Sequence, residues 1–213
     1  MDNAIELSNE LREYIFESSE PVHPVLRRVI EQTQAMTERS MQVTPEQSIF
    51  LRAMVRLVKP QRILEIGTFT GLSSLVMASA LPAGGRITCL DVSEEFTAIA
   101  RQAWGEAGVA DKIELILGPA LETIVSLQGP YDMVFIDADK GNLQAYVEAV
   151  LPMLPSGGVV MVDNTLWRQL VVTDDPTPST VTIQKFNAWL KDHPDFDVEM
   201  IGIADGLTLA IRR

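Results

Sequence analysis

Apolar runs recur along the chain from about residue 60 and alternate with segments of helical periodicity. Each run is short, and those at 133–136 and 159–162 are continuous, which is typical of strands that are buried on both faces of a sheet. Strands that alternate with helices predict βαβ units and a parallel sheet, and right-handed crossovers place the helices on both of its faces. The runs lie at 62–67, 87–91, 113–117, 133–136 and 159–162.

Helix signals fill the gaps between these runs. A helix is expected over 72–81, where Pro82 and the glycines that follow stop it. Ser93 is the expected N-cap of the next helix, which reaches about residue 108 and carries Glu94 and Glu95 in its first turn.

The end of the chain follows a different pattern. Residues 198–203 and 207–211 are separated by Asp205-Gly206, a pair typical of a tight hairpin turn. A hairpin needs antiparallel strands, so the last strand is expected to run against the others. The prediction is an α/β fold with a doubly wound, mostly parallel seven-stranded sheet, an antiparallel C-terminal hairpin and N-terminal helices.

The first 60 residues are predicted to be wholly helical, with two helices at about 4–18 and 24–39. A third begins where Thr44 is the cap, Pro45 takes the first position and Gln47 closes a capping box. The expected apolar face of this third helix consists of Ile49, Phe50, Met54, Leu57 and Val58. Near the other end of the chain, residues 173–180 contain two prolines and no apolar pattern, so they are expected to form a loop, a candidate lid.

The 213 residues fit a single domain, with N-terminal helices over 1–59 and the α/β core over 60–213. The net charge of −12 argues against a nucleic-acid partner, because phosphate binding needs a basic face. The one cysteine, Cys89, allows no intrachain disulfide and fits a reducing compartment, so we expect a cytoplasmic protein. Neither a signal peptide nor a long apolar run is recognised, so no membrane association is expected.

Oxygen-bearing side chains follow two of the predicted strands, at Asp137-Ala138-Asp139-Lys140 and at Asp163-Asn164. In open α/β sheets, ligands bind at the carboxyl ends of the strands. Two carboxylates and an amide suit Mg²⁺, Mn²⁺ or Ca²⁺, with Mg²⁺ the first choice. Taken singly, each of these residues is more often a helix cap or a turn former.

Lys140 lies three positions after Asp137. A lysine is ordinarily a solvated surface charge, but beside a divalent cation its ammonium form is disfavoured, and the neutral amine can act as a base. The two histidines, His23 and His193, are distant from these motifs in the sequence, which weighs against zinc or iron. Surface or packing roles are expected for both.

The first predicted strand ends in the turn Glu65-Ile66-Gly67-Thr68-Phe69-Thr70-Gly71. Glycines here let a ligand approach the backbone at a helix N-terminus. The turn lacks the G-x-G-x-x-G dinucleotide fingerprint, and a glutamate before it disfavours phosphate and favours a cationic or hydroxyl-rich group, such as an amino acid or a ribose. The alternative is a tight turn without a ligand.

Asp91 ends the second predicted strand. An acidic residue at this place can accept hydrogen bonds from ribose hydroxyls. The alternative is a solvated strand end, since aspartate is common in turns.

Together, these motifs resemble those of the cation-dependent class I O-methyltransferases, which include catechol O-methyltransferase and the caffeoyl-CoA O-methyltransferase group. The similarity is closer to the second group and its bacterial relatives, and it covers about residue 20 to the C-terminus. It rests on the motifs at 41–45, 65–71, 137–140, 163–167 and 205–209. There are two departures: Arg168-Gln169 follows Trp167 where the family often carries glycine, and no substrate-binding insertion precedes Asp137.

The resemblance implies a Rossmann-like fold, S-adenosylmethionine as methyl donor, a catechol-like phenolic substrate and a homodimer with the N-terminal helices in its interface. It implies Asp137, Asp163 and Asn164 as metal ligands and Lys140 as the base. The implied cofactor contacts are Val43, Glu65, Gly67, Thr68, Ser73, Asp91, Ala120, Asp137, Asp139 and Tyr146.

The implied reaction is methyl transfer to a phenolic oxygen. A phenol titrates near ~10, so its ionisation at pH 7 costs about 4 kcal/mol. A divalent cation that binds two vicinal hydroxyls would stabilise the oxyanion, while Lys140 removes the proton and the fold aligns sulfur, methyl and oxygen.

Three other interpretations stay open at this point. An NAD-dependent oxidoreductase shares the first strand-turn-helix and Asp91 but requires a second glycine where Phe69 stands. A non-catalytic S-adenosylmethionine-binding module does not require Lys140. A nucleic-acid or protein methyltransferase is the third, and the acidic charge disfavours nucleic acid.

Overall fold

The computed structural model describes residues 7–19 and 23–213, and a seven-stranded sheet forms its centre. The strands are β1 (Arg62–Ile66), β2 (Arg86–Asp91), β3 (Ile113–Leu117), β4 (Met133–Ile136), β5 (Val159–Asp163), β6 (Phe196–Ile201) and β7 (Leu207–Arg212). Their order in the sheet is β3-β2-β1-β4-β5-β7-β6. β1 to β5 are parallel, and β7 runs antiparallel to both β5 and β6. The predicted fold class and the five core strands are confirmed.

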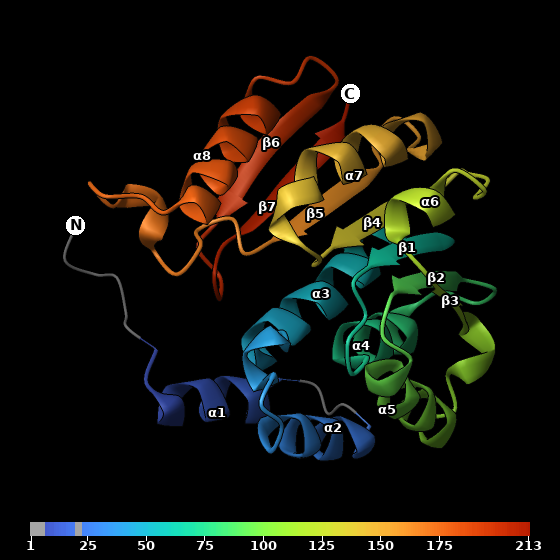
Figure 1. Cartoon of the computed structure of the whole chain (residues 1–213). Coiled ribbons are helices and arrows are strands. Elements are labelled where there is room, and N and C mark those ends of the chain that lie inside the picture. The colour runs from blue at the N-terminus through green and yellow to red at the C-terminus, as the bar shows by residue number, and fades with distance from the viewer. Residues whose placement is uncertain (1–6, 20–22) are drawn as a thin grey trace.

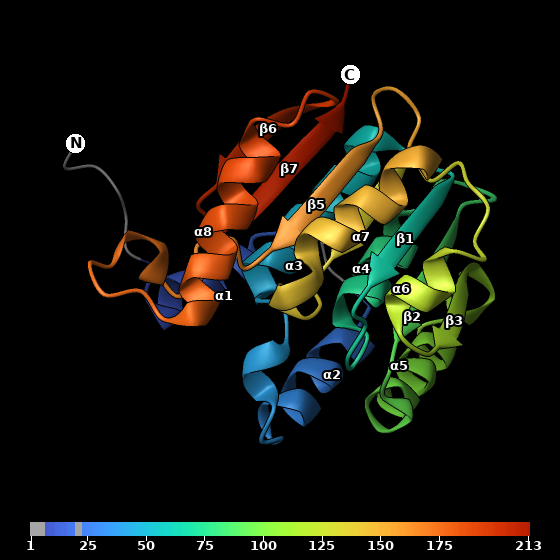
Figure 2. The ribbon, with the colours of Figure 1, turned by 45° about the horizontal axis from the view of Figure 1, so that its top comes forward.

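Helices cover both faces of this sheet, as Figures 1 and 2 show. The α-helices of the described residues are α1 (Asn9–Glu17), α2 (Val25–Gln34), α3 (Pro45–Val58), α4 (Leu72–Ala80), α5 (Glu94–Glu106), α6 (Ala120–Ile124), α7 (Leu143–Val150) and α8 (Pro178–Lys191). α3, α4 and α5 pack on one face, and α6, α7 and α8 pack on the other. None of the helices in the described residues combines the length and the apolar composition that crossing a membrane requires.

Alternate strand residues feed the two hydrophobic cores. In β1, Ile63 points to the core under α3 to α5, and Leu64 points to the core under α6 to α8. Met133 and Val134 in β4 divide in the same way. Both faces of the central strands are therefore buried, which explains why these strands are continuous apolar runs in the sequence.

The C-terminal hairpin is confirmed, and Asp205-Gly206 lies in its turn, although the connection is longer than a two-residue turn. β6 ends at Ile201, which pairs with Leu207, and residues 202–206 connect the two strands. The backbone of Asp205 accepts a hydrogen bond from the N–H of Leu166, and that of Gly206 accepts one from the loop after β5. The N–H of Gly206 also donates a hydrogen bond to the carbonyl oxygen of Ile203, so contacts inside and outside the hairpin together fix this turn.

Helix α3 starts as predicted, since Thr44 Oγ1 accepts a hydrogen bond from the N–H of Gln47. The side chain of Gln47 does not close a capping box, however; it is 1% exposed and lines a cavity. The predicted apolar face is confirmed in part, because Phe50, Met54 and Val58 pack against the core. Leu57 is 77% exposed, and the buried face combines Leu51 and Val55 with polar side chains, because α3 covers the cavity as well as the sheet.

The other predicted boundaries need smaller corrections. Residues 178–180, expected to belong to a loop, form the first turn of α8, which Thr177 caps. α2 ends at Gln34, well before the predicted residue 39, and a 3₁₀ turn follows at Arg39–Met41. The helix predicted over 4–18 is α1, and residues 4–6 lie outside the described residues.

Candidate active site

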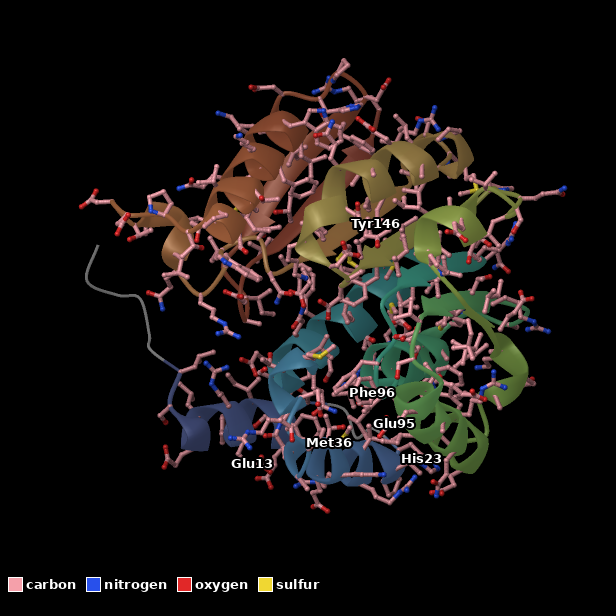
Figure 3. The ribbon with its side chains drawn as sticks, in the orientation of Figure 1. Glu13, His23, Met36, Glu95, Phe96 and Tyr146 are labelled. Carbon is pink, nitrogen blue, oxygen red and sulfur yellow. The ribbon has the colours of Figure 1, made fainter. Side chains whose placement is uncertain are left out.

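A cavity of about 1260 Å³ opens at the carboxyl ends of β1, β2, β4 and β5, where α3 and the segments after these strands surround it. The predicted site residues that line it are Val43, Gly67, Thr68, Ser73, Asp91, Ala120, Asp137, Asp139, Lys140, Tyr146, Asp163 and Asn164. Glu65 lies behind this lining and is fully buried. Neither His23 nor His193 lines the cavity, and Figure 3 shows His23 far from Tyr146.

The turn after β1 packs directly against the end of β4. Gly67 has a φ of 89°, and a Cβ atom on it would lie 2.0 Å from the carbonyl oxygen of Asp137. Glycine is therefore required here by conformation and by contact. Asp91 holds the same turn from β2, because its Oδ2 accepts hydrogen bonds of 2.8 Å from the N–H groups of Thr68 and Phe69.

Glu65 lies beneath this turn in an environment that disfavours its charge. Burial raises the pKa of Glu65 to about 7, and a 2.6 Å hydrogen bond from Ser73 Oγ opposes the rise. Its Oε2 is buried and has no hydrogen-bond partner in the described part of the chain. A buried carboxylate with an unpaired oxygen suits a ligand that brings an ammonium group.

Asp137, Lys140, Asp163 and Asn164 meet where β4 and β5 end. Lys140 Nζ lies 3.3 Å from Asp137 Oδ1. The side chain of Asp163 is 2% exposed, and its Oδ1 accepts a hydrogen bond of 2.8 Å from the N–H of Asn164. Asn164 has a φ of 61°, a left-handed conformation that asparagine tolerates better than most residues.

The electrostatics of this cluster fit a cation. Burial and the neighbouring carboxylate of Asp137 raise the pKa of Asp163 to about 7. Burial also raises the pKa of Asp137, which Lys140 counteracts. Within residues 7–19 and 23–213, no three His, Cys, Asp or Glu side chains gather as a metal site, so the candidate ligands here are two carboxylates and the amide of Asn164. Two carboxylates and an amide oxygen form a donor set for a hard divalent ion.

Asp139 turns away from the cation cluster. Its carboxylate accepts hydrogen bonds from the hydroxyl of Tyr146 on α7 and from Nδ2 of Asn142. Burial and this bond to Asp139 raise the pKa of Tyr146. Tyr146 and Asp139 therefore form a hydrogen-bonded pair on the wall of the cavity.

Comparison with known proteins assigns this architecture. The sequence profile of the O-methyltransferase family matches residues 16–213. The chain belongs to the O-methyltransferase family. Catechol O-methyltransferase domain-containing protein 1 of Mus musculus is 35% identical over 210 residues, which cover 96% of this chain and 80% of the relative.

Two further relatives agree with this assignment. Caffeoyl-CoA O-methyltransferase of Eucalyptus gunnii is 32% identical over 221 residues, which cover 96% of this chain and 88% of the relative. The crystal structure of the O-methyltransferase from Bacillus cereus in complex with S-adenosylhomocysteine superposes with a TM-score of 0.87 at 28% identity, covering 96% of this chain and 97% of the other. The predicted family and enzyme class are confirmed, and the protein is an S-adenosylmethionine-dependent O-methyltransferase. The NAD-dependent oxidoreductase is thereby set aside.

The methyltransferase cavity also contains residues that sequence reasoning missed. Arg12 on α1 forms an ion pair with Glu46 on α3, and both line the cavity with Gln47. Trp167 and Arg168 also line it from the loop after β5, and the sequence had already marked both, the first in the Asp-Asn motif and the second as a departure from the family pattern. Arg12 carries no motif that would mark it, and Glu46 and Gln47 resemble the ordinary first turn of a capped helix, so no local signal could have identified them.

Proposed function

We propose that this methyltransferase transfers the methyl group of S-adenosylmethionine to one hydroxyl of a catechol-like molecule with the help of a divalent cation. The observation that carries the proposal is the convergence of Asp137, Lys140, Asp163 and Asn164 in one cavity with the turn after β1. The first group supplies a cation site and a base, and the second supplies a site for an amino acid and a ribose.

The donor would occupy the part of the cavity next to β1 and β2. Glu65 and Ser73 would hold the ammonium of its methionine part, since Glu65 Oε2 has no partner among the described residues. Asp91 would accept hydrogen bonds from the ribose, because a carboxylate has about four acceptor sites and backbone N–H groups occupy three. Val43, Ala120 and the Asp139–Tyr146 pair would complete this pocket.

The acceptor would bind next to the ends of β4 and β5. Asp137, Asp163 and Asn164 would hold Mg²⁺, with Mn²⁺ or Ca²⁺ as alternatives. When bound, such a cation stabilises the oxyanion of a vicinal diol and fixes its direction. Lys140, as the neutral amine, would take the phenolic proton; transfer forms the new C–O bond, breaks the methyl C–S bond and leaves S-adenosylhomocysteine.

The names of the relatives support a phenolic acceptor, since they are called catechol and caffeoyl-CoA O-methyltransferases. We further propose a homodimer in the cytoplasm, with the N-terminal helices in the interface. Leu57 on α3 is 77% exposed in the single chain and would be covered in such a dimer. Light scattering of the wild-type protein and of Leu57→Glu tests this proposal. A monomer mass for both proteins contradicts it.

The experiment for the activity uses labelled S-adenosylmethionine, Mg²⁺ and a panel of catechols and matched monophenols. We expect methylation of the catechols alone, its loss in EDTA and its return with added Mg²⁺. Asp163→Ala should lose turnover while retaining S-adenosylhomocysteine binding, and Asp111→Ala, exposed in the turn before β3 and outside the cavity lining, is the matched control. Full turnover in EDTA would refute the metal role, and equal methylation of monophenols would refute the diol requirement.

A further inference from the structure

The loop after β5 places Arg168 on the wall of the cavity in a fixed backbone conformation. Trp167, Arg168 and Gln169 have φ values of 48°, 54° and 64°, three consecutive left-handed residues without a glycine among them. Each costs on the order of 1 kcal/mol or more relative to a normal conformation. Such strain persists only where the surroundings impose it, and it concentrates at binding sites.

The contacts that impose this backbone conformation come from the connection between β6 and β7, residues 202–206. Asp205 Oδ1 accepts a hydrogen bond of 2.5 Å from the N–H of Arg168, and Asp205 O accepts one of 2.9 Å from the N–H of Leu166. At Gly206, an added Cβ atom would lie 2.7 Å from the backbone nitrogen of Leu166. The two loops are packed against each other, so the root of the Arg168 side chain is held in place although its guanidinium is exposed.

The charges on the cavity wall single out this guanidinium. Three cationic side chains line the cavity: Arg12, Lys140 and Arg168. Arg12 is paired with Glu46, and Lys140 is paired with Asp137. The side chain of Arg168 makes no hydrogen bond or ion pair within residues 7–19 and 23–213, and Asp205 is bonded to its backbone only. An unpaired arginine at a ligand cavity is a ready partner for a planar anion.

We infer that Arg168 binds a carboxylate of the acceptor, so that the acceptor is a dihydroxy aromatic acid in preference to a neutral or a cationic catechol. This inference rests on the proposed function. Arg168 lies four residues after Asn164, so one loop joins the site of the reacting hydroxyls to the site of the anionic end. Trp167 and Met41 also line the cavity and offer apolar surface for the aromatic ring.

The charge of the cavity makes this arginine decisive for selection. The wall carries six acidic residues, so these side chains would repel an anionic acceptor if no cation compensated their charge. An amine on the acceptor would meet Arg168 as a like charge, and a neutral group would lose one charge-assisted contact. The expected order of preference is therefore acid, then amide, then amine.

The test compares 3,4-dihydroxybenzoate, 3,4-dihydroxybenzamide and 3,4-dihydroxybenzylamine, which share the catechol and differ in the charge of one small group. We expect the wild-type enzyme to show a KM about tenfold lower for the acid than for the amide, the size of one charge-assisted contact. Arg168→Gln should raise KM for the acid about tenfold and leave kcat and the KM for the amide unchanged. Added salt should raise KM for the acid in the wild type alone.

Arg101→Gln is the matched control, because Arg101 is exposed on α5, does not line the cavity and gives the same change in net charge. Equal loss in Arg101→Gln and Arg168→Gln would reduce the effect to general charge and overturn the inference. An unchanged preference for the acid in Arg168→Gln also overturns it. If none of the three catechols is methylated by the wild-type enzyme, the proposed function itself fails, so the two failures are distinguishable.

Discussion

Ser73 Oγ donates a hydrogen bond of 2.6 Å to Oε1 of Glu65, and this is the hydrogen bond that joins the first helix of the α/β core to the buried carboxylate of the first strand. The other oxygen of Glu65 has no partner among the described residues. The pair therefore leaves one half of a buried carboxylate available for a ligand. That arrangement lowers the stability of the empty protein and favours the binding of a cation.

Glu65 should make the stability of the protein depend on pH. Its pKa is about 7 in the folded state and 4.5 as the ordinary value, so the folded protein binds the proton more tightly. The free energy of unfolding should then fall as pH rises from about 4.5 to 7, by about 3 kcal/mol from this group. Glu65→Gln should remove that part of the dependence in urea unfolding at pH 5 and pH 8. Glu114→Gln, exposed on β3, should not.

The raised pKa of Glu65 should also make cofactor binding depend on pH. If Glu65 binds the ammonium of the ligand as a carboxylate, the free protein must release a proton below pH 7 when the ligand binds. The affinity for S-adenosylhomocysteine should then rise with pH up to about 7 and level off above it. Calorimetry in buffers of different ionisation enthalpy measures the released proton directly. An affinity that does not change between about pH 5.5 and about pH 7 would contradict an ionised Glu65 in the complex.

Lys140 should affect catalysis without affecting cofactor binding. Lys140→Ala should lower kcat by about 10²- to 10⁴-fold, the usual contribution of a general base, with an unchanged Kd for S-adenosylhomocysteine. Lys140→Arg separates the two roles of the side chain. Arginine keeps the positive charge beside Asp137 but does not accept a proton, so it should be as inactive as alanine. Full activity of Lys140→Arg would assign Lys140 an electrostatic role only.

Gly67 should tolerate no side chain. Gly67→Ala places a Cβ atom 2.0 Å from the carbonyl oxygen of Asp137 at a φ of 89°, so we expect a loss of about 3 kcal/mol in the free energy of unfolding. Gly108→Ala is the control, because its φ of 67° is also left-handed but no atom lies within 4 Å of the added Cβ. It should cost about 1 kcal/mol, from backbone strain alone. Similar losses in both variants would show that contact with Asp137 is unimportant.

The sequence by itself determined the central strands, because a strand buried on both faces must be a continuous apolar run. β4 begins and ends at the predicted residues for this reason. The meeting of Asp137, Asp163 and Asn164 with Lys140 was also predictable, since parallel strands bring their carboxyl ends to one edge of the sheet. Ser93 and Thr44 cap their helices as expected, because capping depends on residues within one turn.

Only the tertiary structure decided which distant segments complete the site. The partner of Arg12 is Glu46, 34 positions away, and the bond that holds Arg168 comes from Asp205, 37 positions away. Leu57 was expected in the core and is exposed, while Gln47 was expected at a helix end and lines the cavity. Periodicity reports which face of a helix is apolar, but not the position of α3 over a polar cavity. That position is set by packing between segments far apart in the chain, and local patterns carry no information about it.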